Sequence, residues 1–413
     1  MFSAGIDLVE IGRIRRSMKN PRFCKRVLGR SESAQLALRG FPVQSVAASF
    51  CAKEAFSKAV GTGFSGFGPK DVELIRRPSG RPSLLLSGGA LRLAGGARFS
   101  VSVSHTEQYA CAVVMGENGA PALPETDGLQ ILRSMLKPRP SESNKGDYGR
   151  LLCICGSEGM AGAAVMSAGA ALRCGAGIVE AALPRSIYPI VAVRLPEAVF
   201  TLTDAGPDGT LPEAGFTALK AALSRASACL IGCGLGKSAA AHRAVSLVLK
   251  ESKVPVVLDA DGINIAAEHI DGLNTARGPL ILTPHPGEMA RLLKTTPADV
   301  QAHRELYARG FAAEHGVILV LKGAGTLVAS PDGKLYKNTT GNPGMARGGS
   351  GDVLAGMVAA FAAQGFDPYQ AACGAVYLHG AAGDRCAARL SQSAMLPTDL
   401  IAALPELFLE IGR

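Results

Sequence analysis

Two carboxylates near the start of the chain lie in segments that are otherwise apolar. Asp7 interrupts the apolar run of residues 4–9, and Glu54 lies within FCAKEAFSKAVG, residues 50–61. A carboxylate among apolar residues is costly unless it is paired or binds a cation. Two carboxylates and substrate phosphates are a common magnesium arrangement, because Mg²⁺ keeps its waters and needs few protein ligands. Lys58 lies one helical turn after Glu54, so a simple Glu–Lys pair is the alternative explanation.

A glycine-rich segment near the other end of the chain predicts an anion site. Residues 341–351 contain five glycines and precede a helix-like run that begins at Val353. Free backbone amides at a helix N-terminus bind phosphate oxygens without side-chain charge. Asp352 lies at the mouth of this cradle, either as a helix cap worth about 1 kcal/mol or as a base. Capping does not explain so many glycines in so short a segment, so we favour the functional interpretation.

The elements around the first pair of carboxylates predict an α+β domain over residues 1–118. Apolar alternation indicates a strand, helical spacing indicates helices, and two pairs of apolar runs flanking turns indicate hairpins. The strand covers residues 3–11, the helices 11–38 and 45–61, and the hairpins 72–87 and 99–115. Ser104 and His105 end a strand where the second hairpin turns. A lone histidine is more often structural than catalytic, so this pair counts only together with the carboxylates.

The glycine-rich segment belongs to a repeating strand–helix pattern over residues 144–413. Strand-like runs alternate with helical ones and cover residues 150–156, 177–184, 228–234, 254–262, 280–288 and 317–323. This alternation predicts an α/β three-layer sandwich, a parallel sheet with helices on both faces. Polar or glycine residues follow most of these strands, and ligands bind at that edge of an open parallel sheet.

Charge separates the same two parts of the chain. Residues 1–120 hold 17 basic and 8 acidic residues, whereas the rest holds 26 of each, so the net charge of +9 belongs to the first part. A basic module suggests an acidic partner. We expect no nucleic-acid partner, because no recognition motif accompanies the charge. Residues 119–143 are rich in proline and polar residues around a short apolar stripe, which predicts a linker with a possible short helix.

The cysteines and the hydropathy pattern suggest a reduced, cytoplasmic protein. The ten cysteines lie mostly in apolar runs and show neither CxxC nor zinc-ligand spacing. Asp7, Glu10 and Arg13 interrupt the apolar region that a signal peptide would need, and no uncharged apolar stretch reaches about 18 residues. We therefore expect neither a signal peptide nor a membrane partner.

Three segments of the first part resemble the holo-acyl-carrier-protein synthase family. They are GIDLVEI at residues 5–11, AKEAFSKAVGTG at 52–63 and SVSHTEQYA at 102–110. The resemblance covers residues 4–116 and implies the 4′-phosphopantetheinyl transferase fold. The implied reaction transfers 4′-phosphopantetheine from coenzyme A to a serine of an acidic acyl carrier protein. Whether a protein base or a metal-ordered water takes the serine proton stays open.

The same resemblance implies roles for particular residues. Asp7 and Glu54 would be catalytic and would hold Mg²⁺. The coenzyme A contacts would be Lys53, Lys58, Ser104 and His105, and the carrier-protein contacts would be Arg13, Arg15, Arg16 and Arg22. The family also implies a homo-oligomer, a trimer or higher, with sites between subunits. The acidic run usual before the second helix is reduced here to LGRSES, residues 28–33, which affects carrier selectivity.

Five segments of the second part resemble the NAD(P)H-hydrate dehydratase family of the ribokinase-like superfamily. They are residues 144–179, VVLDADGIN at 256–264, LTPHPGEMARLL at 282–293, VLKGAGTLV at 320–328 and NTTGNPGMARGGSGD at 338–352. The resemblance runs from about residue 144 to 404. It implies that the 6-hydroxyl of (6S)-NADHX or NADPHX is phosphorylated from ADP or ATP and that phosphate is then eliminated. Phosphate is a far better leaving group than hydroxide, which is why a nucleotide is consumed.

The residue roles again follow from the resemblance. Asp352 would be the catalytic base, and the hydrate would contact Ala163, Gly234, His285 and Asp352. The adenine nucleotide would contact Lys322, Gly323, Ala324, Gly325, Thr326 and Gly351. The alternative for His285 is that TPHPGE, residues 283–288, is only a rigid turn. Arg347 and Ser350 stand where the family more often has threonine, which we expect to affect nucleotide preference.

Two rival functions remain open. The second part could phosphorylate a small alcohol such as a vitamin precursor, against which residues 156–164 and TPHPGE argue. The first part could be only a docking platform for acyl carrier protein, against which the presence of both Asp7 and Glu54 argues. Residues 1–120 leave no room for the epimerase domain that many hydrate-repair proteins carry, so we expect epimerisation of the R-hydrate to occur elsewhere or spontaneously.

Overall fold

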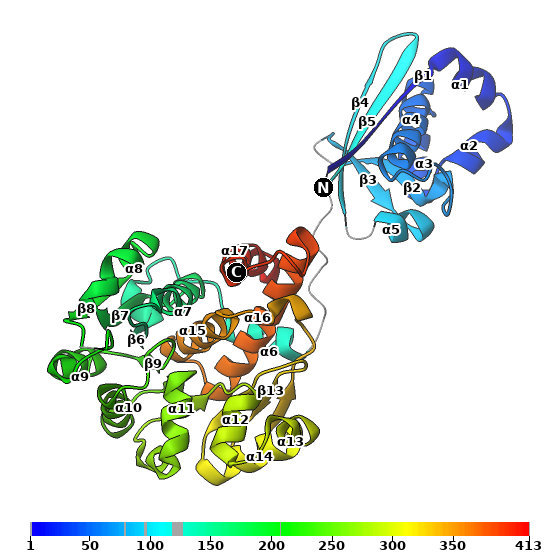
Figure 1. Ribbon diagram of the computed structural model, residues 1–413. Helices are drawn as coiled ribbons and strands as arrows, with labels where there is room; N and C mark the ends of the chain where they lie inside the picture. The colour runs from blue at the N-terminus through cyan, green and yellow to red at the C-terminus, as the bar shows by residue number, and fades with distance from the viewer. Residues whose placement is uncertain (1, 78–79, 95–96, 118–126, 207, 413) are drawn as a thin grey trace. The chain divides into compact units, whose positions relative to one another are not determined.

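The structure is a computed structural model that describes residues 2–77, 80–94, 97–117, 127–206 and 208–412. The chain divides into two compact units, residues 1–122 and 123–413. Each unit has its own hydrophobic core, and the second unit has two. We describe the two units separately (Figure 1).

The first unit is an α+β fold built around helix α4. Its elements are β1 (Phe2–Glu10), α1 (Ile11–Met18), α2 (Pro21–Val27), α3 (Arg30–Ala37), α4 (Val43–Ala59), β2 (Val72–Arg76), β3 (Pro82–Leu86), α5 (Gly88–Ala94), β4 (Arg98–His105) and β5 (Tyr109–Glu117). The expected helical stretch 11–38 is three helices, because Pro21 starts a new helix and Gly29 precedes another. The strand and both hairpins lie where the sequence predicted them.

Helix α4 packs against one face of the antiparallel sheet β1-β5-β4. A side chain at Gly5 would overlap the carbonyl of Ala55, so glycine is what lets helix and strand approach closely. The opposite face exposes apolar side chains, since Ile6 and Leu8 are 60% and 63% exposed and Met115 is 53% exposed. Among the described residues of the first unit, no element covers this exposed sheet face.

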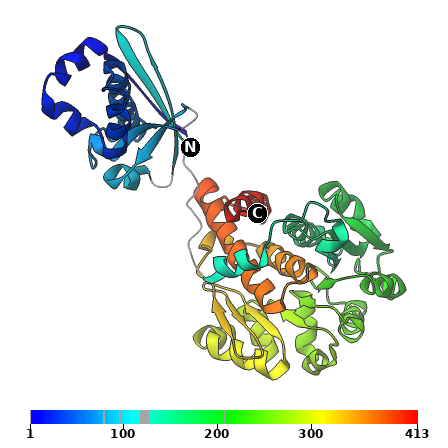
Figure 2. The same cartoon turned by 180° about the vertical axis from the view of Figure 1, so that it is seen from behind.

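The second unit is a nine-stranded sheet with helices on both faces, as the strand–helix pattern predicted (Figures 1 and 2). The strands, in spatial order, are β14 (Leu335–Lys337), β13 (Leu327–Ala329), β12 (Ile318–Leu321), β11 (Leu280–Leu282), β10 (Val256–Leu258), β9 (Ala228–Ile231), β6 (Arg150–Ile154), β7 (Ile178–Pro184) and β8 (Val199–Thr203). Strands β12 to β8 in this order are parallel, whereas β13 and β14 form an antiparallel edge. Sequence patterning did not identify β8, β13 or β14.

Two layers of helices cover the sheet. One layer contains α6 (Asp127–Met135), α7 (Ala161–Arg173), α8 (Tyr188–Arg194), α15 (Ser350–Ala363), α16 (Pro368–Leu390) and α17 (Pro397–Ile411). The other contains α9 (Phe216–Leu223), α10 (Ala239–Glu251), α11 (Asp261–Glu268), α12 (Pro286–Leu293), α13 (Pro297–Ala302) and α14 (Arg304–His315). Among the described residues, none of these helices combines the length and hydropathy that a membrane crossing requires.

Helix α6 differs from what we expected of the segment 119–143. The predicted helix is present, but Leu129 and Leu132 are fully buried in the core of the second unit, and α6 packs on α16. The physical reason is its apolar stripe, which is stabilised by burial against a neighbouring helix rather than by exposure in a linker. Residues 119–126 of the expected linker lie outside the described residues.

Candidate functional site

The carboxyl ends of the parallel strands of the second unit bring the polar residues together. Cys233 follows β9, Asp259 follows β10, Thr283 follows β11 and Lys322 follows β12. The N-terminus of α15, which carries Asp352, lies against the same edge. Parallel strands place their C-terminal loops side by side, so residues far apart in the sequence meet there.

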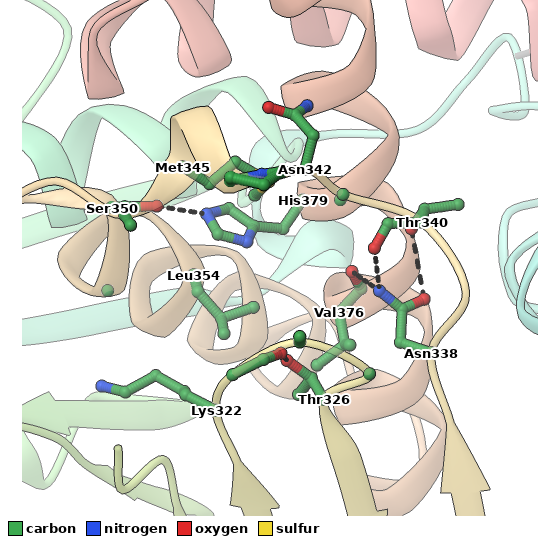
Figure 3. Close-up of a pocket in the computed structure, with 18 of the residues that line it drawn as sticks. Lys322, Thr326, Asn338, Thr340, Asn342, Met345, Ser350, Leu354, Val376 and His379 are labelled. Atoms are coloured by element: carbon green, nitrogen blue, oxygen red, sulfur yellow. Dashed lines mark hydrogen bonds between the residues drawn. The ribbon is translucent and has the colours of Figure 1, made fainter. Parts of the chain in front are cut away.

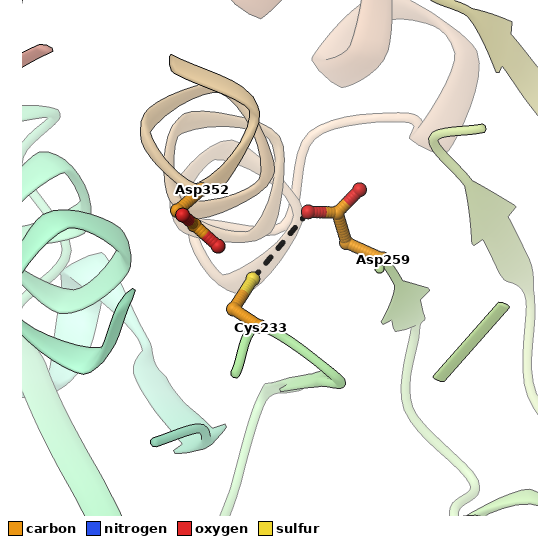
Figure 4. Close-up of side chains that lie close together, drawn as sticks. All are labelled: Cys233, Asp259 and Asp352. Carbon is orange, nitrogen blue, oxygen red and sulfur yellow. Dashed lines mark hydrogen bonds between the residues drawn. The ribbon is translucent and has the colours of Figure 1, made fainter. Parts of the chain in front are cut away.

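Asp352 lies beside two other groups that compete for protons (Figure 4). Ligand atoms of Asp352, Asp259 and Cys233 all lie within 4.8 Å of one another, and Cys233 Sγ is 3.5 Å from Asp259 Oδ2. Burial, and then the negative charge of Asp259, raises the pKa of Asp352 to about 6. A carboxylate with this pKa can accept a proton near neutral pH, which suits a general base.

A partly buried lysine balances the acidic groups of the site. Lys322 Nζ lies 2.7 Å from Asp259 Oδ1 and 3.8 Å from Glu288 Oε2. Burial acts to raise the pKa of Asp259, but the Lys322 ammonium outweighs it and holds that pKa below its usual value. Burial raises the pKa of Glu288 to about 7 despite the same ammonium. A side chain on Gly351 would lie 3.2 Å from Lys322 Nζ, so this ammonium lies next to the N-terminus of α15.

A cavity of about 830 Å³ adjoins the N-terminus of α15. Its walls come from the 322–326 turn, the segment 338–348, the start of α15 and one side of α16 (Figure 3). Asn338 Nδ2 donates to the carbonyls of Thr340 and Val376, at 3.0 and 3.4 Å. This volume lies in the range of small-molecule sites, and backbone amides with apolar walls suit a nucleotide.

The cavity brings together only some of the residues that the sequence singled out. His285, Gly351 and all of residues 322–326 line it. Ala163 and Gly234 do not, but they adjoin each other, because a side chain on Gly234 would lie 2.8 Å from Ala163 Cβ. Asp352 lies one residue beyond the lining Gly351. The predicted nucleotide residues and His285 therefore share the cavity, whereas Ala163 and Gly234 form a separate contact.

His285 combines a turn with a place in the cavity wall. Its Nδ1 accepts hydrogen bonds from the backbone amides of Gly287 and Glu288, at 2.9 and 3.4 Å, which caps α12. Burial, and then the positive charge of Lys322, lowers the pKa of His285. His285 therefore forms the turn that the alternative explanation described, and it also lines the cavity.

Sequence reasoning missed several groups of this site. Asp259 and Glu288 stood in the strand-end runs but were not assigned roles, although a charged residue directly after a buried strand is a usable signal. His379 lies inside an apolar helix, where burial lowers its pKa to about 4, and its Nε2 is 3.4 Å from Ser350 Oγ. Cys233 looked like one more buried cysteine, and no sequence signal set it apart.

In the first unit, the two predicted metal ligands face each other across α4 and β1. Lys58 Nζ lies 2.8 Å from Asp7 Oδ1 and 3.0 Å from the carbonyl of Ile6. Burial, and then the charge of Asp7, raises the pKa of Glu54, so the two carboxylates are near enough to repel. Both side chains offer carboxylate oxygens, which Mg²⁺ prefers as ligands, and a cation between them would relieve their repulsion. The pair therefore fits Mg²⁺. Lys58 therefore pairs with Asp7 rather than with Glu54, the partner that the alternative explanation gave it.

The prediction that Lys53 contacts coenzyme A is wrong. Its side chain is 1% exposed, and its Nζ lies 2.7 Å from Glu32 Oε2 and also donates to the Val72 carbonyl. Glu32 is itself fully buried and accepts from the backbone amide of Leu74 at 2.9 Å. Residues 53 and 54 are adjacent on a helix and therefore point in different directions, which directs Lys53 into the core.

The remaining predicted residues of the first unit lie apart from the carboxylates. Ser104 and His105 are exposed on β4, which is separated from β1 by β5. The predicted carrier-protein contacts are all exposed on α1 and α2: Arg13, Arg15, Arg16 and Arg22. A single copy therefore presents two separate groups of predicted residues, with Asp7 and Glu54 in one and His105 in the other.

Comparison with known proteins matches each unit to a family. Residues 151–406 match the family model described as NAD(P)H-hydrate dehydratase, and residues 3–114 match that of the 4′-phosphopantetheinyl transferase superfamily. An ADP-dependent (S)-NAD(P)H-hydrate dehydratase of Neisseria meningitidis is 42% identical over 254 residues, 60% of this chain and 81% of that protein. A bifunctional NAD(P)H-hydrate repair enzyme of Moorella thermoacetica is 45% identical over 273 residues, 66% of this chain and 52% of that protein. The chain thus spans about half the length of the bifunctional relative.

A solved structure shows the same likeness for the second unit. The ADP/ATP-dependent NAD(P)H-hydrate dehydratase from Bacillus subtilis, co-crystallised with ATP/Mg²⁺, is 33% identical with a TM-score of 0.58. The match covers 68% of this chain and 97% of that one. Both resemblances stated from the sequence are confirmed by these matches.

Proposed function

The chain belongs to the NAD(P)H-hydrate dehydratase family, and from that membership we propose that its second unit dehydrates (6S)-NAD(P)H hydrate to NAD(P)H at the expense of ADP or ATP. The terminal phosphoryl group of the nucleotide passes to the 6-hydroxyl, and elimination of phosphate then restores the nicotinamide double bond. We assign this unit to the ribokinase-like α/β sandwiches and the first unit to the 4′-phosphopantetheinyl transferase fold.

One observation carries the proposal for the second unit: a carboxylate with a pKa near 6 stands at the glycine-rich start of α15, next to a cavity of nucleotide size. Asp352 acts as the base that takes the proton of the attacking hydroxyl. Gly351 and residues 322–326 bind the nucleotide. Ala163, Gly234 and His285 bind the hydrate.

The test follows the absorbance of NADH at 340 nm during incubation of the protein with NADHX and ADP or ATP. Recovery by the wild type and its loss in Asp352→Asn are expected. Absence of recovery, together with phosphorylation of a small alcohol, would support the rival kinase function. Pure R-epimer supplied alone is expected to react only at the rate of spontaneous epimerisation.

For the first unit, we propose transfer of 4′-phosphopantetheine from coenzyme A to a serine of acyl carrier protein. The match of residues 3–114 to the transferase superfamily supports the reaction class, and the exposed arginines of α1 and α2 support an acidic partner. Asp7 and Glu54 would hold Mg²⁺, which neutralises charge on the pyrophosphate when bound. The ammonium of Lys58 bonds Asp7, but its side chain is half exposed. We propose that the same ammonium also contacts a phosphate of coenzyme A.

We also propose that the first unit forms a homo-oligomer, a trimer or higher. The uncovered sheet face with Ile6, Leu8 and Met115 supports this, because exposed apolar surface of this kind favours association. Ser104 lies on that face in register with Cys111, whereas Asp7 and His105 alternate with the residues of that face along their strands.

Mass spectrometry of apo acyl carrier protein incubated with the full chain, coenzyme A and Mg²⁺ tests the transferase proposal. A mass increase matching one phosphopantetheine is expected for the wild type, and Glu54→Ala is expected to abolish it. Modification by Glu54→Ala would contradict the metal assignment, and none by the wild type would support the docking-platform alternative. A monomeric mass in sedimentation would contradict the proposed oligomer.

A further inference from the structure

Helix α16 lies under the segment that forms one wall of the nucleotide cavity. His379 and Gly380 of α16 line that cavity together with residues 338–343 of the wall (Figure 3). The segment starts at the end of β14 and leads to the start of α15, so it connects the sheet edge to the anion cradle. Its position therefore determines the shape of the cavity next to the phosphate-binding amides.

Asp384, one turn further along α16, uses both carboxylate oxygens on this segment. Its Oδ2 accepts from the backbone amide of Gly341 at 2.8 Å, and its Oδ1 accepts from Asn342 Nδ2 at 2.9 Å. The other side of the Asn342 amide is also used, because its Oδ1 accepts from the backbone amide of Gly344 at 3.0 Å. Within the described residues, Asp384 forms no ion pair, so its charge acts on these two donors.

Two glycines of α16 bring the helix close enough for these bonds. A side chain on Gly380 would overlap Thr340, and one on Gly383 would overlap Met345. Thr340 Oγ1 also donates to the carbonyl of Tyr377 at 2.9 Å. The segment is therefore tied to α16 on the side of Thr340 and on the side of Asn342, with Asp384 providing the charged contact.

We propose that Asp384 is a positioning residue for the adenine nucleotide: it holds the 341–342 turn in the form that completes the nucleotide cavity. The inference rests on the proposed dehydratase function for the identity of the nucleotide. In the described part of the chain its hydrogen bonds go to Gly341 and Asn342, so we expect it to act on nucleotide affinity rather than on proton removal. Hydrogen bonds to a charged acceptor are stronger than those to a neutral acceptor, so the charge of Asp384 strengthens its two bonds to the turn.

The test measures ADP affinity of the full chain by calorimetry and, separately, KM and kcat for ADP and NADHX. Asp384→Ala is expected to weaken ADP binding about tenfold, the loss typical of a charge-assisted hydrogen bond. KM for ADP is expected to rise in parallel, while KM for NADHX stays within about twofold. Asp384→Asn keeps an acceptor for Gly341 and is expected to recover part of the affinity.

A matched control is Glu406→Ala, since this carboxylate of α17 also contacts α16, through Arg385 and Arg389 at 3.4 and 3.0 Å, but not the cavity segment. It is expected to leave ADP affinity unchanged. Asn342→Ala removes one partner of Asp384 from the other side, and its effect on ADP affinity is expected to be non-additive with that of Asp384→Asn.

Four outcomes separate the explanations. Unchanged ADP affinity in a folded Asp384→Ala protein would overturn the inference, as would additive effects of Asp384→Asn and Asn342→Ala. A lower kcat with unchanged KM for ADP would mean that Asp384 only stabilises the fold and would also overturn it. If the wild type binds ADP but does not dehydrate NADHX, the proposed function fails, and the comparison of ADP affinities still decides the role of Asp384.

Discussion

Replacing Asp352 by asparagine is expected to stabilise the second unit at neutral pH while it abolishes dehydration. The pKa of Asp352 is about 6 in the folded protein against an ordinary value of 3.8. The folded state therefore binds the proton more tightly than the unfolded state does. At pH below 3.8 both states are protonated, and the carboxyl carries no penalty. Between about pH 3.8 and 6 the unfolded state ionises while the folded state still holds its proton, so stability falls across this window. Above pH 6 the folded state holds a buried charge that the unfolded state exposes to water.

The difference between 3.8 and about 6 corresponds to about 3 kcal/mol, present in full above pH 7. About half of this penalty is already present at pH 5. Asparagine has the same shape and no charge, so its gain in stability should follow that curve. The same substitution removes the catalytic base, so we expect activity to be lost as stability is gained, which is common at active sites.

Denaturant unfolding of the ligand-free full chain, followed by circular dichroism, measures this gain. The stability of Asp352→Asn relative to the wild type is compared at pH 5 and pH 8. The same change at the exposed Asp271 is the matched control, because water screens an exposed charge. In parallel, kcat/KM of the wild type should fall below about pH 6 as one proton binds. The reasoning is refuted if Asp352→Asn is no more stable at pH 8, or if its gain is the same at both pH values.

Three further predictions follow from burial and close packing. Lys53→Met leaves Glu32 buried without its partner and should destabilise the first unit by about 3–5 kcal/mol, measured by thermal unfolding, and the added change Glu32→Leu should recover part of this loss. Gly356→Ala should lower the stability of the second unit by about 1–3 kcal/mol, because its Cβ would lie 2.8 Å from the carbonyl carbon of Ser167, and unchanged denaturant midpoints would contradict this. Asp7→Asn should raise the Mg²⁺ concentration for half-maximal phosphopantetheine transfer at least about tenfold, whereas an unchanged magnesium dependence would exclude Asp7 as a ligand.

Local patterns predicted many of the elements of both units. The alternation around Asp7 predicted β1, and the repeated strand–helix runs predicted a parallel sheet with two helical layers. These features depend on side-chain period and on turn residues, which are properties of neighbouring positions. The edge strands β13 and β14 were missed because three-residue strands are too short to show a period.

Packing decided the features that sequence patterning predicted wrongly or left open. Helix α6 has the apolar stripe that the sequence showed, but only the tertiary structure places it in the core rather than in a linker. Lys53 and Glu54 are adjacent in α4, and the sequence predicted a ligand-binding role for both. The elements packed around α4 decide which side of this helix faces the core, and Lys53 lies on that side and pairs with Glu32.

The sequence by itself determined the two-part organisation, the glycine-rich cradle before Asp352 and the carboxylate pair Asp7 and Glu54. These follow from composition, local spacing and motif order, which folding does not alter. The tertiary structure alone decided which distant groups act on one another. Asp259 raises the pKa of Asp352, and Asp384 holds the turn at Asn342. Both effects need charges or hydrogen-bonding atoms within a few ångströms, and only the folding of separate strands and helices onto one edge of the sheet creates those distances.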